Sequence, residues 1–194
     1  MKKLVATDLL SLERYSRERP EFRARVIAHK KNRQLNVGPN AMWLFEDRVT
    51  VQYQVQEMLR TERIFEAEGI ADELAAYNPL IPDGANWKAT FLIEYTDPEV
   101  RRVQLEKLRG IEDHCWVKVE GFERVTAIPD EDLERSNEVK TSAVHFLRFE
   151  LNTAMADRLK SGAALSVGID HPNYQHQLAP VADNVRAALV TDLS

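Results

Sequence analysis

The chain has 194 residues, 44% of them hydrophobic and 29% charged, a balance typical of a soluble globular protein with one large or two small domains. It contains no apolar run near the ~20 residues of a membrane-spanning helix, its first eight residues are too polar for a secretory signal, and its single cysteine excludes an internal disulfide and a cysteine-built metal site. These points predict a cytoplasmic location.

The charge is uneven along the chain. Residues 1–35 contain ten Lys or Arg and four acidic residues, a net charge of +6, so the remainder carries −11 of the overall −5. Such asymmetry is typical of a nucleic-acid-binding arm, or of a basic helical segment packed on an acidic body. Acidic and apolar residues interrupt the basic ones, which favours docking of residues 8–33 through Phe22, Val26 and Ile27.

Residues 1–80 are predicted to be mainly helical. Apolar spacing favours a short helix over 8–16, and Pro20 fits the first turn of a second helix. A short apolar strand is expected at 41–45. Residues 49–65 alternate in polarity as a strand does, but they also fit helical spacing and include good helix formers, which favours a helix. Another helix over 67–78 ends before Pro79, because the residue preceding a proline avoids the helical region.

Residues 87–170 predict the element order β-α-β-β-α-β. Strands are expected over 87–95, 115–120 with an extension toward Ile128, 143–151 and 164–169, with helices after Asp97 and Asn152. This is the ferredoxin-like pattern, in which one antiparallel sheet is covered by two helices. Strands 88–95 and 142–150 would then be neighbours, with Ile93 and Phe146 in the core. The fold class is α+β in a single domain, with a mainly helical part at 1–80, a ferredoxin-like part at 87–194 and a final helix from Pro180.

Three of the five histidines suggest a metal site. His145 lies in the third predicted strand, while His171 and His176 lie in a polar segment after the fourth strand. If the three converge, they form a zinc or iron site with an open coordination position. The alternative is that His145 is a hydrogen-bonded core residue and that residues 170–172 form a structural turn.

Four other residues are candidates for binding a ligand or partner. Glu57 and Arg60 share a helix face, where the alternative is a solvated face with weak ion pairs. Arg148 lies in an apolar strand, and a partly buried arginine needs a carboxylate of the protein or an anionic ligand. Tyr174 completes the HPNY segment. We expect a polar pocket where these residues meet. An RNA-binding sheet is disfavoured because the third strand lacks the glycine of that motif and is mostly apolar, and because the body of the protein is acidic.

Five segments resemble a bacterial family known only as domain of unknown function 3501. They are FEDR at 45–48, QVQEMLRTERI at 54–64, YN-x-LIP at 77–82, VHFLRF at 144–149 and HPNY at 171–174. The resemblance covers almost the whole chain. It implies a redox or stress-related pathway, because members of the family are encoded beside rubrerythrin-like and iron–sulfur oxidoreductase proteins.

The function expected from these observations is that of an accessory or binding protein in a bacterial redox or metal-handling pathway, with a rubrerythrin-like or iron–sulfur protein as its partner. The first alternative is a small metalloenzyme that uses His145, His171 and His176 to hold zinc or iron. The second alternative is a nucleic-acid-binding protein that uses the basic N-terminal segment.

Overall fold

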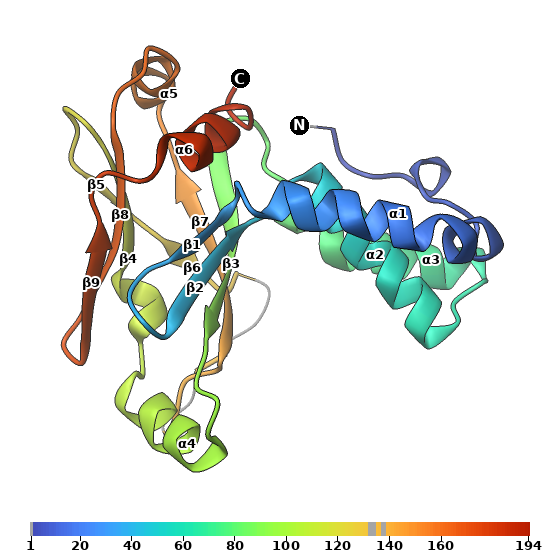
Figure 1. Ribbon diagram of the computed structural model, residues 1–194, viewed down its shortest axis with the longest axis horizontal. Coiled ribbons are helices and arrows are strands. Elements are labelled where there is room, and N and C mark those ends of the chain that lie inside the picture. The colour runs from blue at the N-terminus through green and yellow to red at the C-terminus, as the bar shows by residue number, and fades with distance from the viewer. Residues whose placement is uncertain (1, 132–134, 137–138) are drawn as a thin grey trace.

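A computed structural model describes residues 2–131, 135–136 and 139–194, and it has α+β architecture (Figure 1). Two antiparallel sheets share one hydrophobic core, and a helical layer lies beside the first sheet. In spatial order, the first sheet contains β1 (Gln34–Asn36), β2 (Ala41–Phe45), β3 (Asn86–Ile93), β7 (Val144–Glu150) and β6 (Ile128–Pro129). The second sheet contains β5 (Arg124–Thr126), β4 (Cys115–Val119), β8 (Leu165–His171) and β9 (Tyr174–Leu178).

The ferredoxin-like topology is not confirmed. As predicted, β3 and β7 are neighbours, with Phe91 opposite His145 and Lys88 opposite Arg148. However, β4 and β8 pair with each other in the second sheet, so the four strands do not share one sheet. Alternating polarity identifies the inward residues of a strand but not its partner. Here the apolar faces of the two sheets, which include Phe91 and Val117, cover each other instead of being covered by two helices.

Strand alternation in β3 and β7 decides which side chains face away from the core. Ile93 is buried, as expected, and so are His145 and Phe149. The expectation that Phe146 is also a core residue was wrong, because successive strand residues point to opposite faces and Phe146 shares the outer face with Arg148.

The helical part contains α1 (Leu12–Lys30), α2 (Arg48–Glu62) and α3 (Ala67–Tyr77), with the short 3-10 helices η1 (Ala6–Asp8) and η2 (Asn78–Leu80). The helix predicted over 49–65 is confirmed as α2. Its N-cap is Asp47, whose side chain accepts hydrogen bonds from the backbone N–H groups of Val49 and Thr50. A small separate core lies between these helices, formed by Leu4, Val51, Val55, Leu59, Leu74 and Ile81.

The two helices expected at 8–16 and from Pro20 are one continuous helix. Pro20 lies inside α1, where the missing N–H group removes one helical hydrogen bond. Tertiary packing on α2 outweighs this loss, since Tyr15 and Val26 on either side of the proline are buried. Docking therefore depends on Tyr15 and Val26, whereas Ile27, expected in the contact, is 44% exposed.

The remaining helices lie at the ends of the sheets (Figure 1). They are α4 (Pro98–Lys107), η3 (Ile111–His114), α5 (Thr153–Lys160) and α6 (Asp183–Val190), which begins three residues later than the expected start at Pro180. The HPNY segment is a tight turn in which His171 pairs with Tyr174 across β8 and β9. Among the helices that the structure describes, none is both long enough and apolar enough to cross a membrane.

Candidate functional site

Polar side chains gather on both faces of β7. His145 points into the protein, where it meets Glu112, Asp130 and Thr141; these four residues are called the His145 cluster. On the opposite face, Phe146 and Arg148 line a cleft between the first sheet and the end of α3. The period of two along a strand thus places two different environments next to each other.

The His145 cluster is a buried hydrogen-bond network. His145 Nδ1 lies 2.5 Å from Asp130 Oδ2, and His145 Nε2 lies 2.8 Å from Thr141 Oγ1 and 3.7 Å from Glu112 Oε2. His145 is fully buried, and Thr141 and Glu112 are 1% and 5% exposed. Asp130 Oδ1 accepts a hydrogen bond from the Phe146 N–H and lies 3.3 Å from Arg135 Nε. The network joins η3, the end of β6 and the start of β7.

Two kinds of chemistry fit this cluster in part. Glu112, Asp130 and His145 offer three ligand atoms within 4.8 Å of one another, and an imidazole with two carboxylates suits zinc or iron. A metal would have to replace hydrogen bonds that these atoms already make within the chain. The sequence of contacts from Asp130 to His145 to Thr141 resembles a hydrolase triad, but the Thr141 side chain is too buried to meet a substrate.

The three predicted histidine ligands do not converge. Among the described residues, the group with metal-ligand geometry includes His145 but neither His171 nor His176. His171 Nε2 donates to the Arg109 carbonyl and its Nδ1 accepts from the Asn173 N–H, so both ring nitrogens serve the hairpin turn. Burial lowers the pKa of His171, which favours this neutral form. His176 is exposed on the edge strand β9, with its ring 4.6 Å from that of Tyr174. The prediction of a three-histidine site is therefore wrong, and the described group with metal-ligand geometry is Glu112, Asp130 and His145.

The other predicted residues are also separated. Glu57 does not pair with Arg60; its carboxylate accepts two hydrogen bonds from Arg19 of α1, each 2.7 Å long, and one of 2.6 Å from the Tyr15 hydroxyl. The Arg19 guanidinium lowers the pKa of Glu57 to about 2. Arg60 is exposed. The Tyr174 hydroxyl donates to the Val37 carbonyl and accepts from the Asn40 N–H, and so fastens the β1–β2 turn to β9. Of these candidates, only Arg148 lines the cleft.

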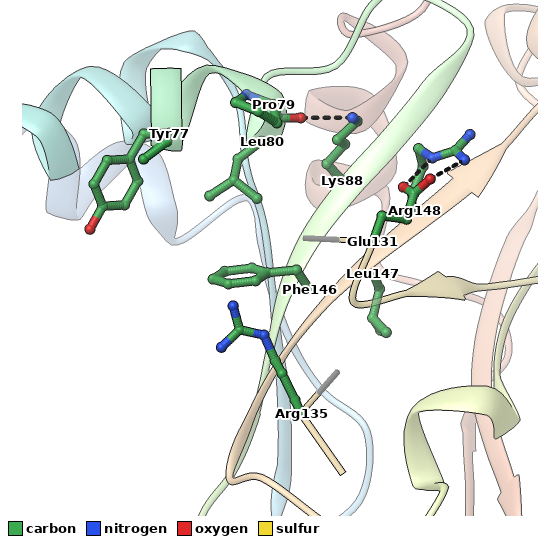
Figure 2. Close-up of a pocket in the computed structure, with 10 residues that line it drawn as sticks. Tyr77, Pro79, Leu80, Lys88, Glu131, Arg135, Phe146, Leu147 and Arg148 are labelled. Atoms are coloured by element: carbon green, nitrogen blue, oxygen red, sulfur yellow. Dashed lines mark hydrogen bonds and ion pairs between the residues drawn. The ribbon is translucent and has the colours of Figure 1, made fainter. Parts of the chain in front are cut away.

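The cleft has a volume of about 370 Å³ and is lined by both apolar and charged side chains (Figure 2). Tyr77 and Leu80 come from the end of α3 and from η2, whereas Lys88, Phe146 and Arg148 come from the outer face of the first sheet. Arg135 places its guanidinium carbon 4.6 Å from the centre of the Phe146 ring. Phe146, Tyr77 and Leu80 supply an apolar surface, and the described lining includes three basic side chains, those of Lys88, Arg135 and Arg148.

Among the described residues that line this cleft, Glu131 is the acidic one. Its carboxylate accepts two hydrogen bonds of 2.6 Å from the Nε and Nη2 groups of Arg148. These bonds are the main reason why the pKa of Glu131 is lowered, and the charge of Lys88 acts in the same direction. Arg148 also donates to Glu150 through Nη1, and Lys88 Nζ donates to the Pro79 carbonyl at 2.7 Å. The sequence-based expectation that Arg148 needs a carboxylate is met within the chain.

A second group of buried charges lies where the helical part meets the sheets. Arg33 is 1% exposed; it donates to the carbonyls of Phe45, Glu46 and Ala188 and to the Asp192 carboxylate. Its Nε also lies 3.5 Å from Asp47, the N-cap of α2. Burial raises the pKa of Asp192 to about 6 although Arg33 opposes this shift. Arg33 and Asp192 are both almost fully buried and pair with each other, so we assign this group a structural role.

Sequence reasoning missed Glu112, Asp130 and Glu131, whose neighbours in space are distant along the chain. Lys88 carried the same signal as Arg148, a basic residue at an alternating position of a strand, and could have been found in the same way. Asp130 has one further mark, a φ of +46°, which non-glycine residues rarely adopt. Its side chain is tied to His145 and Phe146, and these hydrogen bonds offset the strain.

Comparisons with known proteins identify a family and a similar solved structure. The model of a family described as "Protein of unknown function (DUF3501)" matches residues 3–193. A crystal structure of a protein of unknown function from Burkholderia pseudomallei K96243 has 51% sequence identity with the chain and a TM-score of 0.95, and the match covers 100% of both chains. No curated protein matches the chain.

Proposed function

Because the chain belongs to the DUF3501 family of proteins of unknown function, we propose a function from its geometry: it is a binding protein that holds a small anionic molecule in the cleft beside Arg148. The observation that supports this proposal is the composition of the cleft. Lys88, Arg135 and Arg148 stand around an apolar floor that includes Phe146, in a volume of about 370 Å³. Ligand pockets in proteins are of this size, and they join an apolar lining to a few placed polar groups.

The pathway remains part of the proposal. The family resemblance implies an accessory role in bacterial redox or metal handling beside a rubrerythrin-like or iron–sulfur protein. A binding protein with a small-molecule cleft is compatible with that role. The proposal differs from the expected pocket in its residues, because Glu57, Arg60 and Tyr174 do not contribute to the cleft.

A fluorescent probe tests the cleft directly. The dye 8-anilinonaphthalene-1-sulfonate joins an anionic group to aromatic rings, and we expect it to bind the folded protein. Binding should be lost in Arg148→Met and weakened in Phe146→Ala. The matched control is Arg124→Met, since Arg124 also pairs with a carboxylate, that of Asp170, and lies 3.9 Å from the centre of an aromatic ring, that of Trp116. Equal binding by all four proteins would refute the assignment of the cleft.

A second candidate function is metal binding at the His145 cluster, which the closeness of Glu112, Asp130 and His145 favours. This is the remaining form of the metalloenzyme alternative. Elemental analysis of untagged protein tests it: a stoichiometric amount of zinc or iron that is lost in a folded His145→Gln variant supports the candidate. Metal below one-tenth of the protein concentration, after dialysis against zinc or iron(II), would eliminate it.

A further inference from the structure

Arg148 presents its guanidinium to a carboxylate that does not belong to the sheet. Glu131 follows Asp130, the residue at which the chain turns away from β7, and it occupies the fork formed by Nε and Nη2 of Arg148. The Glu131 side chain is 48% exposed, whereas that of Arg148 is 23% exposed. A half-exposed glutamate leaves such a fork by rotating about its own side-chain bonds, since water is ready to solvate its carboxylate.

Arg148 has a second carboxylate partner besides Glu131. Glu150, two residues along the same strand, contacts the third nitrogen of the guanidinium, Nη1. Arg148 therefore keeps a carboxylate partner after Glu131 has left, and its Nε and Nη2 groups become available to another acceptor. A planar fork of this kind matches a carboxylate with two parallel hydrogen bonds.

The neighbouring charges also favour an anion at this position. Lys88 lies directly opposite Arg148 in the register of β3 and β7, on the same outer face. Like charges at directly opposed positions destabilise a sheet. The Glu131 carboxylate interacts favourably with both cations. Removing it leaves Glu150 as the carboxylate partner of Arg148 and takes one negative charge away from the two facing cations, which an external carboxylate would restore.

The apolar floor and the fork belong to the same face of one strand. Phe146 and Arg148 are two residues apart on β7, and both line the cleft. A small molecule that carries both an aromatic ring and a carboxylate would offer one group to Phe146 and the other to Arg148. Tyr77 and Leu80 close the apolar side of the cleft.

We propose that Glu131 holds the place of a ligand carboxylate, so that the cleft selects small arylalkanoic acids and Glu131 competes with them for Arg148. This inference rests on the proposed function and adds the ligand class and the residue that sets its affinity. The opposing reading is that the Glu131–Arg148 pair is an ordinary structural ion pair that no ligand replaces.

The test compares 3-phenylpropionate with its neutral analogue 3-phenylpropanamide. Dissociation constants would be measured by NMR titration for the wild type and for Glu131→Gln, with Glu131→Ala as a second variant should the first fail to fold. The matched control is Glu18→Gln, because Glu18 is 47% exposed and pairs with Arg14 on the surface of α1. Shifts of the Phe146 ring and Arg148 Nε signals report the site.

We expect Glu131→Gln to bind 3-phenylpropionate about fivefold more tightly than the wild type does, in line with the worth of a partly exposed ion pair. Binding of the amide should stay unchanged, as should binding of the acid by Glu18→Gln. Equal affinities of the wild type and Glu131→Gln for the acid would overturn the inference, and so would a gain that is the same for the amide. If the acid binds neither protein while the dye binds at Arg148, the ligand class is wrong and the proposed function stands. If the dye does not bind at Arg148 either, the proposed function itself fails.

Discussion

Replacing Arg33 with methionine tests how the helical part is held to the sheets. Arg33 is 1% exposed and supplies hydrogen bonds to three carbonyl groups and a charged partner to Asp192, which is itself 3% exposed. Methionine fills part of the same volume but removes the positive charge. The Asp192 carboxylate would then be buried without a partner, a change that typically costs about 3–5 kcal/mol of unfolding free energy.

The assay is urea unfolding followed by circular dichroism, with the free energy extrapolated to water. Arg14→Met is the control, because Arg14 forms an ion pair with Glu18 but is 59% exposed, and we expect it to change the free energy by less than about 0.5 kcal/mol. The double variant Arg33→Met/Asp192→Leu should recover at least about 2 kcal/mol relative to the sum of the single variants, since it leaves no buried charge without its partner. A loss below about 1 kcal/mol in Arg33→Met, or strict additivity in the double variant, would refute the reasoning.

Three further predictions concern other residues. The pKa of Asp192 is raised from 3.8 to about 6, so the folded state binds this proton more tightly; the stability it contributes is present below about pH 4 and lost as the pH rises through 6. From pH 4 to pH 6, the unfolding free energy of Asp192→Asn should fall by on the order of 3 kcal/mol less than that of the wild type. Parallel curves for the two proteins would contradict this prediction. His145→Ala should lower the melting temperature through a loss of about 2–4 kcal/mol, because it leaves buried polar groups unpaired even where no metal is present; an unchanged melting temperature would contradict this. Tyr174→Phe should lose about 1–2 kcal/mol in urea unfolding, whereas His176→Gln, on the exposed edge strand, should lose less than about 1 kcal/mol; the reverse order would show that the turn is held differently.

Local patterns in the sequence were sufficient for most of the elements. The cap at Asp47 and the helical spacing that follows it predict α2, and alternating polarity predicts β3 and β7 as strands. The pairing of β4 with β8 in a second sheet could not be predicted in this way, because the same residues of each strand face inward in a single ferredoxin-like sheet and in two separate sheets. Pro20 was misleading for a related reason: its local preference is real, but α1 packs on α2 and buries Tyr15 and Val26, which keeps the helix continuous.

The sequence predicted a residue of the candidate site only where its residue type was unusual for its position in a strand. Arg148 stands out because the apolar residues beside it in the strand cannot pair with a guanidinium. Its partner Glu131 comes from a segment of ordinary acidic composition, and only the fold brings the two together. The histidines misled because residue type was taken as evidence of convergence. His171 and His176 lie on β8 and β9 of one sheet, while His145 lies on β7 of the other.

The contacts of Asp47 affect the rate at which a ligand binds the cleft and the conformational entropy that the protein loses on binding. One carboxylate caps α2, lies 2.5 Å from His29 near the end of α1 and approaches Arg33 before β1, so the helices meet the sheet at a fixed angle. The α3 wall of the cleft packs on α2 and is placed by this joint, while the opposite wall is the sheet itself. Both walls are in position before a ligand arrives, and only the Glu131 side chain has to leave Arg148, so little ordering of the backbone accompanies binding. Because rotation of an exposed side chain is fast, association should show no slow closing phase.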